Sequence, residues 1–318
     1  MIEHESTKTF IHTSVLLEEV IEYMNLRPEG SYLDATVGGG GHSLRMVQAL
    51  GGGHLYALDQ DAHALEAAKQ RLASYASKTT FLRGNFEHAK EILAGLGVDA
   101  LDGILLDLGV SSPMFDTPER GFSYRFDGPL DMRMDQDQAL CAHTIVNTYT
   151  QERLAKIIAM YGEEKFARNI AKHIVLARNE KLIESTFQLN DIIKAAIPAK
   201  MRRDTHPSKR TFQAIRIECN RELEVLEKAL QELTSILKPA GRLLIITFHS
   251  LEDRMVKNAF RTMENPCICP PSFPVCVCHR VSRGSVITRK AIVPSEQEQI
   301  DNPRSKSAKL RVFEKRLA

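Results

Sequence analysis

Tryptophan is absent from this sequence, and aromatic residues make up only 6% of its 318 residues. No apolar stretch approaches the roughly 20 residues that a membrane-spanning helix needs. Residues 1–14 also lack the apolar core of a signal peptide. A large net charge is missing as well, since 42 Lys and Arg oppose 40 Asp and Glu. These absences exclude a membrane-spanning protein and predict a cytoplasmic one.

What is present is the composition of an ordinary globular protein. Hydrophobic residues make up 43% of the chain and charged residues 26%, which is typical of a soluble fold, and the length allows two domains. The charges are unevenly spread: residues 200–210 hold five Lys or Arg and one acid, and residues 254–318 hold 13 and 5. Such segments slightly favour RNA or DNA as a partner, although ordinary solvated surface has the same composition.

A run of four glycines, residues 38–41, separates a short apolar segment from a helical one. The apolar segment ends in Asp34, and the helical one extends from Ser43 to Leu50. Glycine permits positive φ and a close approach of a ligand to the backbone, and amides at the start of a helix favour a carboxylate or phosphate. Strand, glycine loop and helix in this order predict the first crossover of a nucleotide-type binding sheet. A plain glycine-rich turn is the alternative.

Two further expected strands also end in aspartate. Residues 54–59 end in Asp59, and the nearly continuous apolar segment 101–107 ends in Asp107. A continuous apolar strand is expected in a parallel sheet that is covered on both faces. Such open α/β sheets bind ligands at the carboxyl ends of their strands. The sequence therefore predicts an α/β, Rossmann-like doubly wound sheet with a binding site at that edge.

The next strand of this sheet, residues 242–248, arrives more than 130 residues later, although a crossover usually needs a dozen residues or somewhat more. The intervening sequence has helical spacing of its apolar residues and no convincing alternation, which predicts an inserted helical domain. Two late segments, residues 285–293 and 308–315, are expected to pair as an antiparallel edge. The predicted division is a first part of the sheet domain, an insert and a second part of the sheet domain, at residues 1–112, 113–214 and 215–318.

The glycine spacing also indicates which cofactor the turn binds. A dinucleotide site needs G-x-G-x-x-G; Gly38 and Gly40 fit its first two positions, but Ser43 occupies the third. An acid before the glycines and acids on the next strands suit S-adenosylmethionine better. Asp34 can face the ammonium of its methionine end, and Asp59 can hold the ribose diol. The pattern therefore favours S-adenosylmethionine over NAD.

Motifs spread along the chain together resemble one family. The resemblance is to the bacterial small-subunit ribosomal RNA cytosine-N4 methyltransferase family, of the MraW or RsmH type, and it covers nearly the whole chain. It implies a class I S-adenosylmethionine-dependent methyltransferase with an inserted helical domain. The implied substrate is one cytidine of the decoding region, in small-subunit ribosomal RNA or in the assembled small subunit. The motifs are HTSVLLEE at residues 12–19, GGHS at 40–43, GILLDLGVSSP at 103–113, RGFS at 120–123, GPLDMRMD at 128–135, YGEE at 161–164, TFQAIR at 211–216, FHSLEDR at 248–254 and NPRS at 302–305.

The resemblance also implies which residues bind the cofactor. The family carries Gln just after the Ser-Ser-Pro turn, and this chain has Met114 there, which leaves a side-chain hydrogen bond at that point open. The implied cofactor residues, from the methionine end through the ribose to the adenine, are Gly40, Gly41, His42, Asp59, Phe86 and Asp107.

Methylation of a cytosine amine needs alignment and hydrogen-bond acceptors. The sulfonium methyl is already activated, so catalysis is mostly positioning, and an acceptor on the amine can localise its lone pair and take the leaving proton. Asp107 and the backbone of residues 108–113 are the first candidates, and Asp131 and Asp135 are the next. For those two, a salt bridge to Arg133 or a structural cap is an equally good interpretation.

The cytosine must leave its stack to reach the cofactor, so a clamp on the RNA strand is expected. The insert supplies Arg202, Arg203, Lys209 and Arg210, which are the candidate RNA-binding residues, although they also fit a solvated basic face. His249 is a further candidate. For His249 we favour two roles, bracing of the end of the fifth strand or contact with RNA, over a role as a catalytic base.

Four of the six cysteines lie within twelve residues. Clustered thiols in a cytoplasmic chain indicate metal binding more than disulfides, but one residue between ligands is tighter than the usual C-x-x-C knuckle. A structural zinc and a reduced, proline-rich loop both stay open. The other two cysteines, in helical contexts, are expected in or near the core. The clustered residues are Cys267, Cys269, Cys276 and Cys278, and the remaining pair is Cys141 and Cys219.

Other functions compete with an RNA methyltransferase. A nicotinamide-dependent oxidoreductase predicts stabilisation by NAD(P)H, and a non-catalytic RNA-binding assembly factor predicts RNA binding without methyl transfer. A DNA amino-methyltransferase is a nearer alternative, but the sequence after Asp107 is not the Pro-Pro-aromatic run of such enzymes.

Overall fold

The computed structural model describes residues 14–202, 206–270, 272–273 and 275–317. Within them, seven strands form one sheet with the order β3-β2-β1-β4-β5-β7-β6. Strands β1 to β5 are parallel, and β7 is antiparallel to both of its neighbours. The strands are β1 (Ser31–Asp34), β2 (His54–Asp59), β3 (Thr79–Arg83), β4 (Leu101–Asp107), β5 (Leu237–Thr247), β6 (Gly284–Val286) and β7 (Lys309–Lys315).

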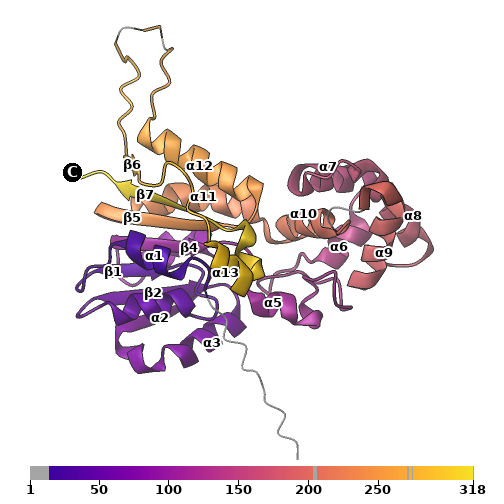
Figure 1. The fold of residues 1–318 in the computed structure, drawn as a ribbon, viewed down its shortest axis with the longest axis horizontal. Coiled ribbons are helices and arrows are strands. Elements are labelled where there is room, and N and C mark those ends of the chain that lie inside the picture. Colours follow the sequence, from indigo (N-terminus) through magenta and orange to yellow (C-terminus); the bar gives the residue numbers. More distant parts are fainter. Residues whose placement is uncertain (1–13, 203–205, 271, 274, 318) are drawn as a thin grey trace, which may run out of the picture.

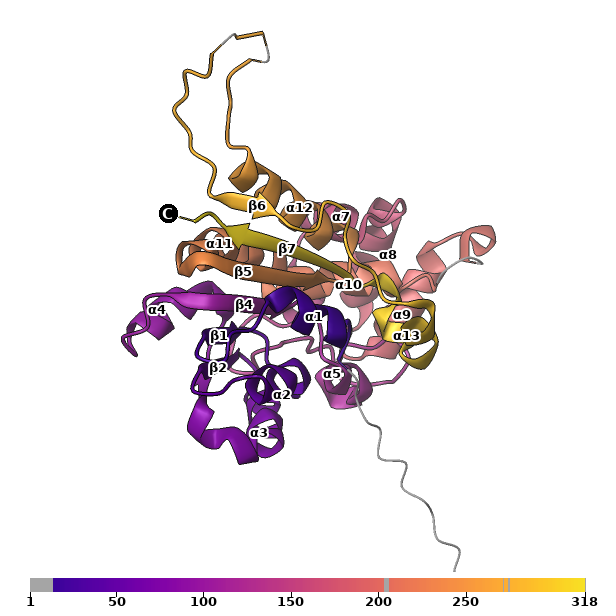
Figure 2. The same ribbon diagram turned by 60° about the vertical axis from the view of Figure 1, so that its left-hand side comes forward.

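Helices cover both faces of this sheet (Figures 1 and 2). Along β4, Ile104 and Leu106 pack with one group of helices and Leu105 with the other, which explains why the strand is apolar throughout. The predicted doubly wound sheet is therefore confirmed. One face carries α1 (Leu17–Met24), α2 (Gly41–Gln48) and α3 (Ala62–Arg71), and the other carries α4 (Ala89–Ala94), α11 (Glu222–Ser235) and α12 (Ser250–Glu264).

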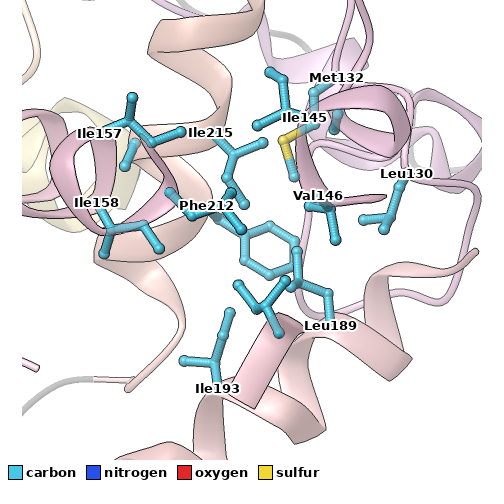
Figure 3. Packing of buried hydrophobic residues seen from close by; sticks show 14 of the residues in the cluster. Leu130, Met132, Ile145, Val146, Ile157, Ile158, Leu189, Ile193, Phe212 and Ile215 are labelled. Carbon is cyan, nitrogen blue, oxygen red and sulfur yellow. The ribbon is translucent and has the colours of Figure 1, made fainter. Parts of the chain in front are cut away.

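The helices between β4 and α11 form a second body beside the sheet (Figure 1). Phe212 and Ile215 on one helix pack against Ile157, Ile158 and Leu189 on others (Figure 3). This cluster contains only residues between 114 and 219, so the segment has a core of its own. The helices are α5 (Ser112–Asp116), α6 (Ala142–Thr148), α7 (Gln151–Gly162), α8 (Ala167–Glu180), α9 (Thr186–Ala196) and α10 (Lys209–Asn220).

We call residues 113–220 the insert, because α10 continues six residues past the expected limit at 214 and ends at Asn220. Cys219 on α10 is buried in the core, as expected, and Cys141 is partly buried just before α6. The division into three segments remains a prediction.

The last strands differ from expectation. The antiparallel edge is present, but β6 ends at Val286 instead of continuing to residue 293. Beyond it, the Thr288 hydroxyl accepts the Val312 N–H at 2.9 Å. A side chain that takes the place of a backbone acceptor interrupts the ladder, and only an isolated bridge at Ile292 follows. β5 begins at Leu237, five residues earlier than expected.

The remaining C-terminal helix, α13 (Glu296–Asp301), lies beside α1 (Figure 1). The Leu16 N–H donates to Glu298 Oε1 at 2.8 Å, which ties the start of α1 to the other end of the chain. Within the described part of the chain, no helix has the length and apolar character needed to cross a membrane.

Candidate active site

Three aspartates lie at the carboxyl ends of adjacent strands. Asp34 at the end of β1 pairs in register with Ala57 of β2 and Leu105 of β4. Asp59 and Asp107 therefore each stand two residues beyond the paired position, on either side of Asp34. The predicted convergence of the three acids on one edge of the sheet is confirmed. We call this edge the rim.

The glycine turn follows Asp34 and holds the rim in place. Gly38 and Gly40 have φ of 49° and 75°, values that side chains with a Cβ rarely adopt. A Cβ on Gly41 would stand 1.9 Å from the Ser14 hydroxyl oxygen and 3.2 Å from the Ser14 Cβ, so Ser14 would have to turn aside to make room for it. α2 begins at Gly41, two residues earlier than expected, so its first-turn amides face the end of the glycine run.

Asp34 is bound within this turn. The Ser43 hydroxyl donates to its carboxylate at 2.7 Å and the Thr36 N–H at 3.3 Å, and Asp34 is 1% exposed. Burial raises the pKa of Asp34 to about 6, although both hydrogen bonds oppose this shift. These contacts show Asp34 as the residue that shapes the turn. Its contact with a ligand ammonium stays a prediction.

Asp59 holds the turn from the neighbouring strand. One carboxylate oxygen accepts the Gly38 N–H at 2.9 Å, and the other accepts the Asp61 N–H at 2.9 Å. Burial raises the pKa of Asp59 to about 6 against these hydrogen bonds. A carboxylate has about four acceptor sites, so each oxygen keeps capacity for a hydroxyl of a ligand. This geometry suits a ribose diol.

Asp107 is the least satisfied of the three. Its N–H donates to the Thr36 hydroxyl at 2.6 Å, but its Oδ1 is buried and has no hydrogen-bond partner among the described residues. Burial, and then the charges of Asp34 and Glu252, raise its pKa well above the usual range. A buried acceptor without a donor is costly, and a donor from a substrate would remove that cost.

His42 lies beside Asp107, a link that sequence reasoning missed. Its Nε2 is 2.9 Å from the Val15 carbonyl oxygen, which can only accept, so Nε2 carries a hydrogen. Its Nδ1 is 3.7 Å from Asp107 Oδ2. The 3.7 Å separation is too long for a hydrogen bond, so the imidazole is a polar neighbour of this carboxyl at the rim. The spacing of GGHS in the sequence showed that His42 was close to the turn, but not which acid it would meet.

Phe86 lies on the other side of Asp59, where the adenine is expected. It begins a short 3₁₀ turn, η2 (Phe86–His88), just after β3, and it is half-buried against the sheet. The neighbouring Asn85 amide donates to Gln60 Oε1 at 2.9 Å. Gln60 in turn lies 3.4 Å from the sulfur of Met134 in the insert. The insert thus reaches the adenine side of the rim.

Arg120 makes the strongest connection between the insert and the rim. Its guanidinium donates to Asp61 Oδ2 at 2.9 Å and to the carbonyls of Arg133 and Met134 at 2.9 and 3.1 Å. The side chains of Arg120 and Asp61 are only 9% and 5% exposed. Sequence reasoning noted the RGFS motif but assigned no role to its arginine. The motif marked Arg120 as a candidate, but the sequence could not show that its partner would be Asp61.

Asp131 and Asp135, the second choice for proton acceptors, are both paired. Arg133 donates to both oxygens of Asp131, at 3.0 Å from Nε and 2.7 Å from Nη2. Asp135 lies 3.3 Å from the guanidinium of Arg83 at the end of β3. The structure thus contains the salt bridge that was the alternative for Asp131. Its catalytic role stays a prediction.

His249 caps α12 and is buried, with a side chain 7% exposed. Its Nδ1 accepts the Glu252 N–H at 3.4 Å, and Glu252 Oε2 accepts the Phe248 N–H at 2.8 Å. These contacts brace the end of the fifth strand, which was one of the two roles favoured for His249. Contact with RNA stays a prediction for His249.

Charge around His249 is already balanced. Burial alone would raise the pKa of Glu252, but His249, Arg216 and a backbone N–H outweigh it and lower that pKa. Arg216 also donates to both oxygens of Glu222, at 2.7 and 2.8 Å. Glu222, His249 and Glu252 are close enough to hold a metal ion, but the guanidinium already supplies positive charge there.

Met114, where the family carries Gln, is 6% exposed and packs into the core of the insert. Its helix, α5, is held from outside by Arg304, whose Nη1 donates to Asp116 at 3.0 Å and to the Ser112 carbonyl at 3.3 Å. The thioether therefore serves packing, and the NPRS motif anchors the helix that follows the candidate acceptor backbone.

The expected RNA-binding residues lie at the start of α10. Lys209 and Arg210 are exposed, and Arg210 donates to the Glu163 carbonyl at 2.9 Å. Arg202 ends the 3₁₀ turn η4 (Ala199–Arg202), and only its backbone is described. Arg203 lies outside the described residues.

Aromatic side chains next to this basic segment were missed. Tyr124 stacks on His206 with ring centroids 4.2 Å apart and planes 16° apart. Phe126 in the same loop is 45% exposed. Aromatic faces beside basic residues are typical of sites for unpaired bases. These two aromatics lie between the RGFS and GPLDMRMD motifs, and only the fold brings Tyr124 next to His206.

Sequence comparison agrees with this geometry. A profile of the MraW methylase family matches residues 9–316. The chain is 58% identical over 308 residues to the ribosomal RNA small subunit methyltransferase H of Lachnospira eligens, covering 96% of this chain and 98% of that one. It is 52% identical over 307 residues to the protein of the same name from Clostridium botulinum strain Kyoto, covering 96% and 99%.

Among solved structures, a putative methyltransferase from Streptococcus mutans in complex with SAH is similar in outline. It is 10% identical, covers 96% of this chain and 99% of its own, and has a TM-score of 0.43. The fold is shown by the sheet order, with antiparallel β7 between β5 and β6, and by the family match over nearly the whole sequence. The chain therefore belongs to the MraW methylase family and is an S-adenosylmethionine-dependent methyltransferase of the class I fold.

Proposed function

We propose that this protein transfers the methyl group of S-adenosylmethionine to the exocyclic N4 amine of one cytidine in the decoding region of small-subunit ribosomal RNA. The observation that carries the proposal is the buried, unpartnered Oδ1 of Asp107 at the end of β4. An amine hydrogen is the kind of donor that this oxygen lacks. A relative that is 58% identical to this chain is named as a methyltransferase of small-subunit ribosomal RNA, which supports ribosomal RNA as the substrate class. Such a substrate also supports the cytoplasm as the compartment.

The rim fits the cofactor. Asp59 has acceptor capacity for the ribose hydroxyls, Phe86 offers an apolar surface for the adenine, and first-turn amides of α2 suit the methionine carboxylate. The cofactor supplies an already activated methyl group on a sulfonium. The residues that we assign to its binding are Asp34, Gly40, Gly41, His42, Asp59, Phe86 and Asp107.

Asp107 would act on the amine. An ionised carboxylate that accepts one amine hydrogen directs the nitrogen lone pair away from the ring and toward the methyl group. As the N–C bond formed, the bond between the methyl carbon and the sulfonium would break, and its electron pair would stay on the sulfur of the departing S-adenosylhomocysteine. The amine proton would pass to Asp107, whose other oxygen lies 3.7 Å from His42 Nδ1. The raised pKa of Asp107 makes it a better proton acceptor than an ordinary carboxylate.

The insert would hold the RNA strand. Lys209 and Arg210 supply exposed positive charge, and Tyr124 and Phe126 supply aromatic faces on the same body. Phosphate contacts would position the strand, and stacking would keep the flipped base from returning. The connection from Arg120 to Asp61 would align this clamp with the rim.

The decisive experiment uses labelled S-adenosylmethionine with small ribosomal subunits from cells that lack this enzyme, and with free small-subunit RNA in parallel. We expect label on one cytidine, and digestion with mass analysis should place it on N4. Asp107→Asn serves as the matched variant, with cofactor binding measured separately by calorimetry. Label on a ring carbon, a ribose or another base would contradict the proposal, as would RNA binding without any transfer.

A further inference from the structure

The segment between α12 and β6 projects from the sheet domain as a long loop (Figures 1 and 2). None of its described residues between 265 and 283 is buried. Apolar residues in it stay in solvent: Ile268 is 65% exposed, Val275 70% and Val277 59%. A loop of this length without secondary structure is unusual in a compact domain. Apolar packing therefore does not determine its conformation.

The cysteine sulfurs are the part of this loop that converges. Cys276 Sγ lies 3.6 Å from Cys267 Sγ, 3.9 Å from Cys269 Sγ and 3.5 Å from Cys278 Sγ. Cys278 Sγ lies 3.9 Å from Cys267 Sγ. All four sulfurs are within 4.8 Å of one another, and none is in a disulfide. Four thiols have thus come together in an exposed loop with no apolar core to bring them there.

These separations match a tetrahedral metal site. A zinc ion with four thiolates at about 2.3 Å places each pair of sulfurs about 3.8 Å apart. A disulfide would need about 2.05 Å. In an iron–sulfur cluster only two cysteines on the same iron stand this close, whereas Cys276 Sγ lies within 3.9 Å of all three other sulfurs.

The tight C-x-C spacing has a structural explanation. In extended chain, residues i and i+2 point to the same side. Cys267 and Cys269 lie on one arm of the loop, and Cys276 and Cys278 lie on the other, so each arm can present two sulfurs to the space between them. A C-x-x-C knuckle is therefore not required when two extended arms supply the four ligands.

Backbone donors surround the sulfurs as they do around metal-bound thiolates. The Val277 N–H donates to Cys269 Sγ at 3.3 Å. The N–H groups of Arg280 and Ile268 are further donors to Cys278. Such N–H donors stabilise the negative sulfur that a metal ion requires.

We propose that Cys267, Cys269, Cys276 and Cys278 form a structural zinc site that fixes the loop between α12 and β6. Zn²⁺ suits a closed set of four soft sulfur ligands with no open position. Binding releases the protons of the thiols that are still protonated. The site is independent of methyl transfer, because all of its ligands lie on this one projecting loop and none on the strand ends of the rim.

The test uses the full chain, expressed with added Zn²⁺ and purified under reducing conditions. After dialysis against a chelator that removes loosely bound ions, elemental analysis should find one zinc per chain. The double variant Cys267→Ser/Cys276→Ser should lose it. Cys141→Ser, which removes a thiol outside the cluster, is the matched control and should keep it. Reconstitution with Co²⁺ should produce the visible bands of a tetrahedral thiolate site in the native chain and not in the double variant.

A second measurement keeps the test valid if the double variant fails to fold. In the native chain, Zn²⁺ should protect four thiols from alkylation and slow proteolysis within residues 265–283. The proposal is overturned if the native chain, reduced and supplied with Zn²⁺, retains no metal and shows unchanged alkylation. It is equally overturned if the bound metal is iron, if the cysteines are isolated as disulfides, or if the double variant keeps its zinc.

Discussion

The rim of the sheet and the insert are stabilised in opposite ways. At the rim, three buried or half-buried carboxylates and a glycine turn are held by a few short hydrogen bonds, such as those of Asp59 to Gly38 and Asp61. The insert has a conventional apolar core, and Arg120 is a buried charge in it that is paired with Asp61. Loss of one hydrogen-bonding atom should therefore disturb the rim, whereas the insert should tolerate most substitutions outside its core. The cofactor site at the rim therefore depends on backbone geometry, whereas the proposed RNA site depends on which surfaces of the insert are exposed.

The two regions are joined by polar contacts in particular places. Besides Arg120 and Asp61, the carboxylate of Glu163 at the end of α7 accepts from the Ser250 hydroxyl at 2.5 Å and from Arg254 at 3.1 Å on α12. These links orient the insert toward the rim. Variants on either side should therefore have separate effects on the chemistry, on cofactor binding and on RNA binding.

The largest effect is expected from Asp107→Asn. Loss of a proton acceptor at the rim should slow single-turnover methyl transfer by about 10²- to 10⁴-fold. Asp131→Asn in the insert is the control, and it should change the rate far less because Asp131 is committed to Arg133. Equal losses in the two variants would place the proton acceptor in the insert and remove the contrast between the regions.

The acid limb of the rate profile should reveal the same group. Asp107 must be ionised to accept a proton, and its raised pKa means that the ionised form is lost at a pH well above the usual carboxylate range. The single-turnover rate should therefore fall about tenfold per pH unit below that pKa. The limb should lie well above pH 4 and should vanish in Asp107→Asn. A limb at the ordinary aspartate pKa would contradict the assignment.

Asp59→Ala should weaken cofactor binding by about 1–3 kcal/mol, the scale of lost charge-assisted hydrogen bonds. It also removes the acceptor of the Gly38 N–H, so part of the loss reflects a looser turn. Calorimetry with S-adenosylhomocysteine measures the change. An unaltered affinity would take Asp59 out of the cofactor site.

Gly41→Ala should lower the free energy of unfolding by about 1–3 kcal/mol, because overpacking forces neighbours to move. Its Cβ would meet the Ser14 hydroxyl, whereas a Cβ on Gly39 would meet no atom within 4 Å. Gly39→Ala is therefore the matched control, with thermal unfolding as the readout. Equal stability of the two variants would show that the turn has more room than its contacts indicate.

The smallest effect is expected from Lys209→Gln with Arg210→Gln. Each lost phosphate contact should reduce the slope of log affinity against log salt by about one, with little change in cofactor affinity. Lys90→Gln on α4, an exposed charge on the sheet domain, is the control. If the salt slope of the double variant matched that of the native chain, the start of α10 would be ordinary surface.

Several features of the rim could be read from the sequence because they are local. Asp34, Asp59 and Asp107 each end an apolar strand, and parallel strands bring such ends to one edge whatever lies between them. The four glycines mark a turn that needs positive φ. The helical character of the long middle segment also followed from the 3.6-residue spacing of its apolar residues.

Other features needed the folded chain because they join distant segments. The partner of Arg120 is 59 residues away, and that of Arg304 is 188 residues away. The early end of β6 depends on the Thr288 hydroxyl meeting the Val312 N–H across the sheet. The spacing of apolar residues along the sequence could not indicate any of these contacts.

Residues a few positions apart were enough to predict the doubly wound sheet, the acids and glycines of its rim, and the helical nature of the insert. The folded chain was needed to show that Asp107 keeps an unpartnered oxygen beside His42, that Asp131 is paired with Arg133, and that four cysteine sulfurs converge in an exposed loop. Burial and partnership of a polar atom depend on everything packed around it, and those neighbours come from all parts of the chain.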